Sequence, residues 1–431
     1  MSQIAASHGH GHDSHGHPAP NSQLLAESNV NAPGFASGLA YGLLGLGALC
    51  IALTFAYMFA LGGENGFKHG LASYHVGALA GLGFALGPLG ILLIMHLVQA
   101  GWIVTMRRQI ENAAGNMWIA LLLLIPSAIF ASKLFKWTDE GLLATDALLV
   151  KKSPFLNEPF FYARLGIYAV IWIALAWRFR SLSLKQDQTG DKRLSATAKT
   201  LAAPGMIAFA LTTAFAGFDL VMSLDFHWFS TMLGVWFFAG NMIASLGMFA
   251  VIFSMIRASG RLKGLVTDEH FHDLGKLMLG FTVFWAYISF SQYFLIWYAN
   301  IPEETAFYII RGAGGSPNSW TPFFYLLIGG HFIAPFLLLL FRDVKKSTLL
   351  LPAIGLWLMA MHCVDVFWMV RPIVYKLQPE IGAGLSWVDI TGVLGPVCIV
   401  LGMHVRSIGR SPLIPLRDPR LHEAMKHKNY V

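Results

Sequence analysis

Carboxylates and imidazoles interrupt the long apolar runs of this sequence. These side chains, with the polar residues nearest to them, are Asp219, Ser223, Asp225, His227, Gln292, His331, His362, Asp365 and Asp389. An ionisable side chain within a lipid bilayer is energetically expensive, so its presence points to function. A single one can serve simply as an interhelical hydrogen-bond partner. A group of carboxylates and imidazoles at similar depth is instead typical of a proton relay or of a polar pocket for a ligand such as a quinone.

Helical spacing places two pairs of these residues on shared faces. Ser223 follows Asp219 at i+4, and Asp365 follows His362 at i+3, so each pair lies on one side of its helix. We therefore predict that Asp219 and Asp365 face the protein interior. Each pair would then offer a proton two successive stops along its helix.

The sequence offers no ligand pattern for a redox cofactor. Its three cysteines, Cys50, Cys363 and Cys398, lie far apart in apolar runs, and none belongs to a C-x-x-C or C-x-x-C-H pattern. No two predicted helices present the histidine pairs that a b-type haem requires. We predict that this chain binds no metal and no cofactor, so that any electrons pass through partner subunits.

The N-terminal segment is rich in histidine. The tract consists of His8, His10, His12, His15 and His17, broken by Gly and Ser. Alternating imidazoles can bind divalent transition metals, but the same composition describes a solvated tail that binds metal only incidentally. We predict a disordered, His-rich cytoplasmic tail over residues 1–35.

Composition places the polar residues inside a membrane protein. Apolar residues make up 55% of the 431 positions and charged residues only 12%, whereas soluble domains carry about 25% charged residues. Apolar runs of the length that a membrane-crossing helix needs, roughly 20 residues, recur along the chain. We therefore predict an all-α, polytopic transmembrane protein with about ten helices. The predicted helices cover 38–61, 75–98, 116–134, 160–177, 201–222, 230–256, 275–298, 321–341, 348–369 and 387–405.

The distribution of Lys and Arg predicts the orientation in the membrane. If both termini lie on one side, that side receives most of the 30 Lys and Arg residues, and loops rich in these residues are cytoplasmic. The short turn at 225–227 then faces the opposite side. We predict one membrane domain over 36–406, followed by a basic cytoplasmic tail over 407–431. The net charge of +7 follows from this asymmetry and requires no nucleic-acid partner.

Six short segments carry a family resemblance. They are SYHVG at 73–77, FDLVMSLDFHWFS at 218–230, DLGKL at 273–277, WAYISFSQ at 285–292, IWYANIPEE at 296–304 and VDVFW at 364–368. Between about residues 70 and 375 the sequence resembles the ActF family, one of two NrfD-like families of membrane subunits in bacterial alternative complex III. That complex is a quinol:electron-acceptor oxidoreductase of the bacterial inner membrane.

The resemblance implies a fold, a set of partners and a role. The fold would be two four-helix bundles plus a peripheral helix pair. The partners would be a sister NrfD-like subunit, periplasmic iron–sulfur and c-type cytochrome subunits, and a terminal oxidase. In such a complex the quinol site lies in the sister subunit beside an iron–sulfur cluster. The role implied for this chain is structural and proton-conducting.

The resemblance covers only part of the candidate residues. Those at matched motif positions are Asp219, Asp225, His227, Gln292 and Asp365. The other three, His331, His362 and Asp389, are candidates because of their predicted depth in the membrane and the helix face on which they lie. His362 stands where the resemblance leads us to expect Arg.

Three functions remain open at the level of sequence. The first is a non-redox membrane subunit of a quinol-oxidising electron-transfer complex, with a polar relay for protons. The second is a quinol-binding subunit in its own right, which needs an acid or base beside an apolar slot open to lipid. The third is an independent proton-coupled transporter, although no inverted repeat with matching broken helices is visible.

Overall fold

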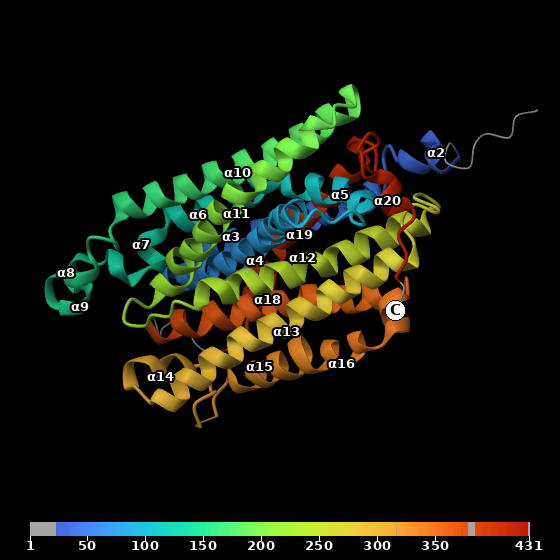
Figure 1. Ribbon diagram of the computed structural model, residues 1–431. Coiled ribbons are helices and arrows are strands. Elements are labelled where there is room, and N and C mark those ends of the chain that lie inside the picture. Colours follow the sequence, from blue (N-terminus) through green and yellow to red (C-terminus); the bar gives the residue numbers. More distant parts are fainter. Residues whose placement is uncertain (1–22, 316, 378–383, 430–431) are drawn as a thin grey trace, which may run out of the picture.

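The computed structural model describes residues 23–315, 317–377 and 384–429. Within these ranges the secondary structure is helical, without a β-strand, and ten helices are long and apolar enough to cross a membrane. The chain is therefore a multi-pass, all-α membrane protein, as its sequence predicts. The long helices run side by side along one common direction (Figure 1).

The ten spans are built from a larger number of helical elements. In chain order they are α3 (Ser37–Ala56) with η1 (Tyr57–Leu61), α4 (Gly63–Leu97), α5 (Val104–Ala114) with α6 (Met117–Ile129), α10 (Glu158–Thr189), α11 (Arg193–Leu220), α12 (Leu233–Ala258), α13 (Asp268–Ala299), α15 (Thr321–Leu326) with η4 (Leu327–Ile333) and α16 (Ala334–Leu340), α18 (Leu350–Leu377), and α19 (Trp387–Ser407). Shorter elements at the two ends of the bundle are α2 (Glu27–Val30), α7 (Ala131–Leu134), η2 (Lys136–Thr138), α8 (Glu140–Thr145), α9 (Ala147–Lys152), η3 (Met222–Leu224), α14 (Pro302–Ile309), α17 (Arg342–Lys346), η6 (Ile408–Arg410) and α20 (Leu421–Met425).

Several helices extend well beyond the predicted apolar runs. α4 begins twelve residues before its predicted start at 75, and α10 continues to Thr189, past its predicted end at 177. Hydropathy marks only the part of a helix that lies in hydrocarbon, whereas the backbone hydrogen bonds continue into the polar interface. The predicted span at 116–134 corresponds to one candidate span, Val104–Ile129, which starts earlier and consists of α5 and α6 separated at Gly115 and Asn116.

The long helices form two four-helix groups and one pair. α4, α5–α6, α10 and α11 pack together, as do α12, α13, α15–α16 and α18, while α3 and α19 pair against the outside of α4. α4 is buried along most of its length, and it also contacts α12 and α18 of the second group. These contacts divide the long helices as the resemblance implies, into two groups of four and one pair.

Glycines allow two of these helix pairs to approach closely. A Cβ on Gly77 of α4 would lie 2.2 Å from the carbonyl oxygen of Gly392 in α19. Gly247 of α12 and Gly355 of α18 face one another in the same way, with a Cβ on either one 2.5–2.7 Å from the other's carbonyl oxygen. Close backbone approach increases van der Waals packing, which is a main source of helix association in membranes.

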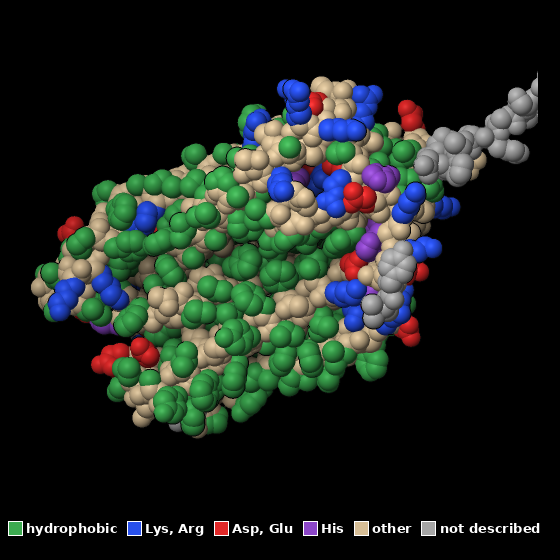
Figure 2. Space-filling view, in the orientation of Figure 1, with side chains coloured by type: hydrophobic (Ala, Val, Ile, Leu, Met, Phe, Trp, Pro, Cys, Tyr) green, Lys and Arg blue, Asp and Glu red, His purple; other side chains and the backbone are tan. Residues whose placement is uncertain are grey.

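The first and last described segments lie at the same end of the helices (Figure 1). The backbone N–H of Leu413 donates to the carbonyl of Val30 at 2.7 Å. Figure 2 shows Lys and Arg side chains gathered at this end and a broad apolar surface beyond it. The first and last described segments thus lie at one end of the helix bundle. That this side is cytoplasmic stays a prediction from the positive-inside rule.

The described parts of both terminal segments pack against the membrane domain. The predicted disordered tail reaches residue 35, but Val30 and Ala32 are buried against the membrane domain. The basic tail from 407 onward also packs, with Leu413 and Ile414 fully buried. These few apolar residues anchor segments whose average composition is polar. The histidine tract at 8–17 lies outside the described residues.

Candidate functional site

The carboxyl group of Asp365 lies buried in the middle of α18 without a cationic partner. Its Oδ2 accepts hydrogen bonds from two indoles, Trp285 Nε1 of α13 at 2.9 Å and Trp236 Nε1 of α12 at 3.3 Å. Its Oδ1 has no hydrogen-bond partner within the described structure, and the side chain is 1% exposed. No Lys, Arg or His among the described residues forms an ion pair with it. Burying a charge is costly unless it is paired, so this is an unusual place for a carboxyl group.

His362 lies one turn before Asp365 and faces the same region. His362 Nδ1 and Asp365 Oδ2 approach the same point, 3.3 and 3.4 Å from where a Cβ on Gly240 would sit. This confirms that the pair at i, i+3 shares a buried face. The His362 ring nitrogens form no hydrogen bond of standard geometry, although the backbone of Ala80 lies near them.

Asn241 extends this polar group toward α4. The Asn241 Oδ1 and His362 Nε2 atoms each lie 2.5 Å from the position of a Cβ on Gly83. A glycine at 83 is therefore what allows both polar side chains to sit against α4. One turn further along α12, Ser245 donates a long hydrogen bond, at 3.5 Å, to the carbonyl of Gly83.

His331 joins the group through Trp285. The two rings are 4.1 Å apart between centroids, and neither His331 nitrogen has a hydrogen-bond partner among the described residues. His331 lies in η4, a π-helical segment inserted between α15 and α16. Such π-helical turns are frequent at functional sites. We call Asp365, His362, His331 and Asn241, with the two tryptophans that bond Asp365, the central cluster.

A cavity of about 350 Å³ lies beside the central cluster. Its lining residues are Trp236, Trp285, Ala286, Ser289, Phe290, Tyr293, Tyr308, Phe324, Leu327, Ile328, Phe332, Ile333 and Trp368. Phe290 and Ile333 are 64% and 45% exposed, so the cavity opens between α13 and η4 on the lipid-facing surface. Its inner wall includes the two indoles that donate to Asp365.

Two donors in the cavity wall have no acceptor. The Tyr308 hydroxyl and the Trp368 indole N–H are buried and lack hydrogen-bond partners within the described structure. The Tyr308 hydroxyl lies against the Gln292 amide without hydrogen-bond geometry, and the Gln292 Nε2 is also unpaired. Burial raises the pKa of Tyr308, so its hydroxyl stays a donor at neutral pH. An apolar cavity with unused donors suits an apolar ligand that carries acceptor oxygens.

Asp219 is buried as predicted, but it is fully paired. Arg164 of α10 binds it through two contacts, Nε to Oδ2 at 2.9 Å and Nη2 to Oδ1 at 2.7 Å, and Tyr168 Oη donates to Oδ2 at 2.8 Å. The Ser223 hydroxyl donates to the Asp219 backbone carbonyl at 2.5 Å and not to the Asp219 carboxylate, so the relay step between them stays a prediction. α11 ends at Leu220, so Ser223 lies in η3 and not on the same helix.

Asp389 caps and fastens the start of α19. Its Oδ2 accepts from the backbone N–H of Ser386 in a capping box. Its Oδ1 receives Ser73 Oγ at 2.6 Å, His69 Nε2 at 3.0 Å and Arg371 Nε at 3.3 Å. With this many donors, Asp389 is a structural anchor between α4, α18 and α19 and not a member of the central cluster.

Asp225 and His227 lie in the predicted short turn at the opposite end from the termini. Asp225 is only 5% exposed, and its Oδ2 lies 3.4 Å from Lys376 Nζ. The His227 side chain is half-exposed and contacts Asp146 Oδ2 at 2.7 Å. The pKa of Asp146 is lowered, first by the backbone N–H of Leu149 and then by His227. These contacts dock the 135–157 segment on the turn.

Gln292 lies between the turn and the cavity. Its Oε1 accepts from Ser230 Oγ at 3.1 Å.

Of the nine predicted site residues, the structure thus brings His331, His362 and Asp365 into one cluster and places Gln292 beside the adjoining cavity. Asp219, Ser223, Asp225, His227 and Asp389 belong to separate structural contacts.

Four functional partners are not evident from the sequence. They are Arg164, Arg371, Trp236 and Trp285, none of which was predicted as a site residue. The sequence does offer a signal for Arg164. A buried carboxylate requires a cation. Arg164 lies near the start of the predicted helix 160–177, at the same depth as Asp219 near the end of the predicted helix 201–222. No comparable spacing rule links Asp365 to indoles on two other helices.

Another buried arginine compensates for a proline. Arg311 Nε donates to the carbonyl of Trp368 at 3.0 Å, and Nη2 donates to that of Met369 at 2.6 Å. Pro372 has no N–H for the Trp368 carbonyl four residues before it, so Arg311 supplies the missing donor. Burial lowers the pKa of Arg311 to about 9.

Searches against protein-family models and curated proteins found no match for this chain. The resemblance carried by the six segments therefore stays a prediction.

Proposed function

We propose that this chain is an integral membrane subunit of a quinol-oxidising electron-transfer complex of the alternative complex III type, in the bacterial inner membrane. Within that complex its role is to move protons through the central cluster. The observation that carries the proposal is the buried Asp365 carboxyl, which two indole N–H groups bind and no described cation neutralises. The six motif segments support the choice of complex, and Asp365 lies in one of them.

The central cluster has the features of a proton-transfer site. Asp365 can gain or lose a proton while its Oδ2 remains held by Trp236 and Trp285, so the geometry need not change with the charge. His362 and His331 supply imidazoles with unused nitrogens on either side. Asn241 and Ser245 continue the polar groups along the seam between α4 and α12, toward the end where the termini lie.

The expected partners would carry the redox centres of the complex. In the proposed complex, quinol gives electrons to iron–sulfur and c-type cytochrome subunits, and protons leave through membrane subunits. No three His, Cys, Asp or Glu residues in the described ranges are grouped so that they could hold a metal ion. Purification through an affinity tag tests the assignment. Haem-containing partners should co-purify, whereas an independent transporter would be recovered alone.

Asp365→Asn tests the proton-transfer role. Asn keeps an oxygen acceptor for the two indoles and nearly the same volume, so the complex should assemble. It cannot take up a proton, so quinol-driven proton release from proteoliposomes should fall by about tenfold or more. Glu303→Gln is the matched control, since it removes an exposed carboxylate outside the cluster. An assembled Asp365→Asn complex with unchanged turnover and proton release would refute the role.

A second candidate function rests on the lateral cavity. Aromatic walls, an opening toward lipid and two unused donors suit a quinone head group, whose carbonyl oxygens accept hydrogen bonds. On this reading the chain binds quinol itself, beside the carboxyl that accepts its proton.

A photoreactive quinone analogue tests this second candidate. It should label peptides of α13 or η4, and the label should decrease in Tyr308→Phe and Trp368→Phe. Tyr298→Phe is the control, because Tyr298 lies on α13 but is 76% exposed. Labelling that is absent from these elements, or equal in all variants, would contradict quinone binding in this cavity.

A further inference from the structure

A second cavity, of about 280 Å³, lies near the basic end of the molecule and far from the central cluster in sequence. It is formed where α5 meets α6, against α10 and the end of α19. Its lining residues are Asn112, Gly115, Asn116, Met117, Trp118, Ile173, Ala176, Trp177, Arg180, Ser407 and Arg410. The cavity thus combines two guanidinium groups, several neutral polar groups and an apolar wall.

Neither arginine of this cavity forms an ion pair with a carboxylate of the described residues, although Glu111 attracts Arg180 through space. Arg180 Nε donates to Asn112 Oδ1 at 3.2 Å, and Arg410 is exposed with no hydrogen bond or ion pair among the described residues. The two are close enough to interact electrostatically with each other. A pair of cations held on one cavity favours an anion between them.

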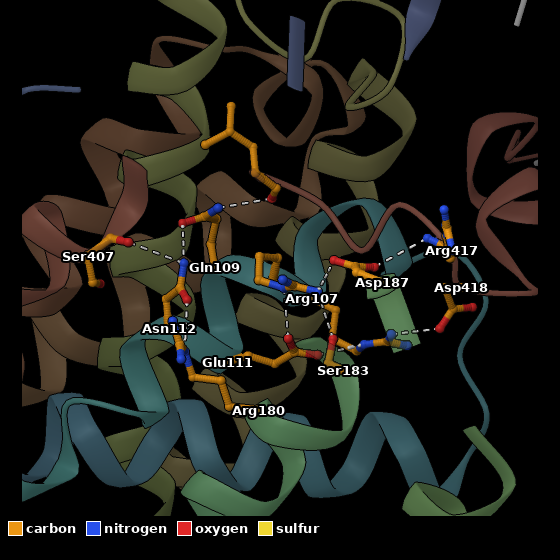
Figure 3. Close-up of polar contacts among 12 residues, drawn as sticks. Arg107, Gln109, Glu111, Asn112, Arg180, Ser183, Asp187, Ser407, Arg417 and Asp418 are labelled. Carbon is orange, nitrogen blue, oxygen red and sulfur yellow. Dashed lines mark hydrogen bonds and ion pairs between the residues drawn. The ribbon is translucent and has the colours of Figure 1, made fainter. Parts of the chain in front are cut away.

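The neighbouring arginines show the contrast. Arg107 pairs with Glu111 and Asp418, and Arg108 pairs with Glu111 and Asp187, at 2.6–3.0 Å. Figure 3 shows Arg107, Glu111 and Asp418 of this network, together with Arg180, which donates to Asn112. The three carboxylates are therefore in direct contact with Arg107 and Arg108, whereas the cavity arginines have no carboxylate in direct contact among the described residues.

The backbone makes room for the Arg180 side chain. A Cβ on Gly115 would lie 3.1 Å from Arg180 Cδ, so the glycine at the α5–α6 junction allows the arginine stem to cross there. Asn116 Nδ2 donates to Ser407 Oγ at 3.2 Å on the opposite wall. Ser407 Oγ in turn donates to the His404 carbonyl at 2.7 Å, so these groups hold the wall of the cavity in place.

The apolar wall continues onto the lipid-facing surface. Trp118 and Trp177 are 48% and 66% exposed, and Ile173 is 41% exposed. Tryptophans of this kind are enriched at the level of lipid head groups. An anion held by the arginines would therefore have its apolar part beside these residues.

We propose that this cavity binds the phosphate of an anionic phospholipid, with Arg180 and Arg410 on the phosphate and the acyl chains along Trp118 and Trp177. Guanidinium groups bind phosphate oxygens in paired contacts, and basic pockets between membrane helices bind anionic head groups. The proposal does not depend on the function of the central cluster. Its site would fix a lipid at the junction of α5, α6, α10 and α19.

Native mass spectrometry of the purified protein or complex tests the proposal. Phosphatidylglycerol should be retained more strongly than phosphatidylcholine with the same chains, and Arg180→Gln/Arg410→Gln should weaken that retention by about tenfold or more. Arg178→Gln is the matched control, because it removes an exposed charge from the same helix outside the cavity. Retention of phosphatidylglycerol should be unchanged in the control.

Three outcomes would overturn the proposal. The first is equal retention of the two lipids by the unaltered protein, a comparison that needs no variant to fold. The second is a folded double variant that retains phosphatidylglycerol as well as the control does. The third is displacement of phosphatidylglycerol by glycerol 3-phosphate at equal concentration, which would assign the site to a free phosphate ester.

Discussion

The Asp219–Arg164 pair makes a quantitative prediction about stability. Asp219 is fully buried and accepts three hydrogen bonds, two from Arg164 and one from Tyr168, at 2.7–2.9 Å. Asp219→Leu leaves the buried Arg164 guanidinium without its counter-charge, which costs about 3–5 kcal/mol. Tyr168→Phe removes one hydrogen bond to a charged acceptor and should cost about 1.5–3 kcal/mol.

A double-mutant cycle separates the ion pair from its surroundings. Arg164→Met/Asp219→Leu removes both charges, so it should cost much less than the two single substitutions together. Some cost should remain, because Arg164 also donates to the Phe155 carbonyl at 2.8 Å and lies over the Phe155 ring. The assay is the free energy of unfolding, measured by titration with a denaturing detergent in mixed micelles.

Two results would refute this reasoning. One is a cost below about 1 kcal/mol for Asp219→Leu, which is the range of an exposed pair. The other is strict additivity in the cycle. Tyr168→Phe should also leave proton release intact, because the contacts of Asp219 join α11 to α10 and serve stability. If Tyr168→Phe lowered proton release without lowering stability, Asp219 would have a role in proton transfer.

Three further predictions follow from contacts outside the central cluster. His227→Cys, in a chain lacking Cys50, Cys363 and Cys398, should react with an impermeant thiol reagent only from the periplasmic side, since most Lys and Arg lie at the other end; reaction only from the cytoplasmic side would reverse the orientation. Asp146 has a lowered folded-state pKa, so its contacts stabilise the docked segment above the ordinary Asp pKa of about 3.9 and are lost as the pH falls through the lowered value. Hydrogen exchange of the Leu149 amide, corrected for its intrinsic rate, should therefore accelerate at acidic pH, and constant protection down to pH 2 would contradict this. Arg311→Met should cost about 1–3 kcal/mol of unfolding free energy by leaving the Trp368 carbonyl unpaired. Adding Pro372→Ala should recover part of that cost by supplying an N–H, and a double variant no more stable than Arg311→Met would count against the compensation.

The fold was largely predictable because hydrocarbon imposes strict rules on sequence. Length and composition were enough to identify ten spans, and the separation of His362 and Asp365 predicted their shared buried face. The extents of the helices were not predictable in the same way. Segments such as the ends of α4 and α10 are polar, and only their tertiary contacts keep them helical.

The candidate site was less predictable, because the type of a residue does not reveal its partners. Asp219 and Asp365 look alike in sequence, each being a carboxylate in an apolar run. The structure pairs one with Arg164 and leaves the other with indole donors only. That difference depends on which side chains of distant helices meet at the same depth, and no local pattern encodes it. Arg107 and Arg108 are similar, because both lie outside the predicted spans and yet are buried and paired with carboxylates.

Redox-triggered infrared difference spectroscopy of the purified complex tests most directly whether Asp365 exchanges a proton. A carboxyl group that gains or loses a proton changes its C=O stretching band. We expect such a band when quinol reduces the unaltered complex, its loss in Asp365→Asn, and its retention in Glu303→Gln. An unaltered complex without the band, or a band that persists in Asp365→Asn, would contradict proton transfer at the central cluster.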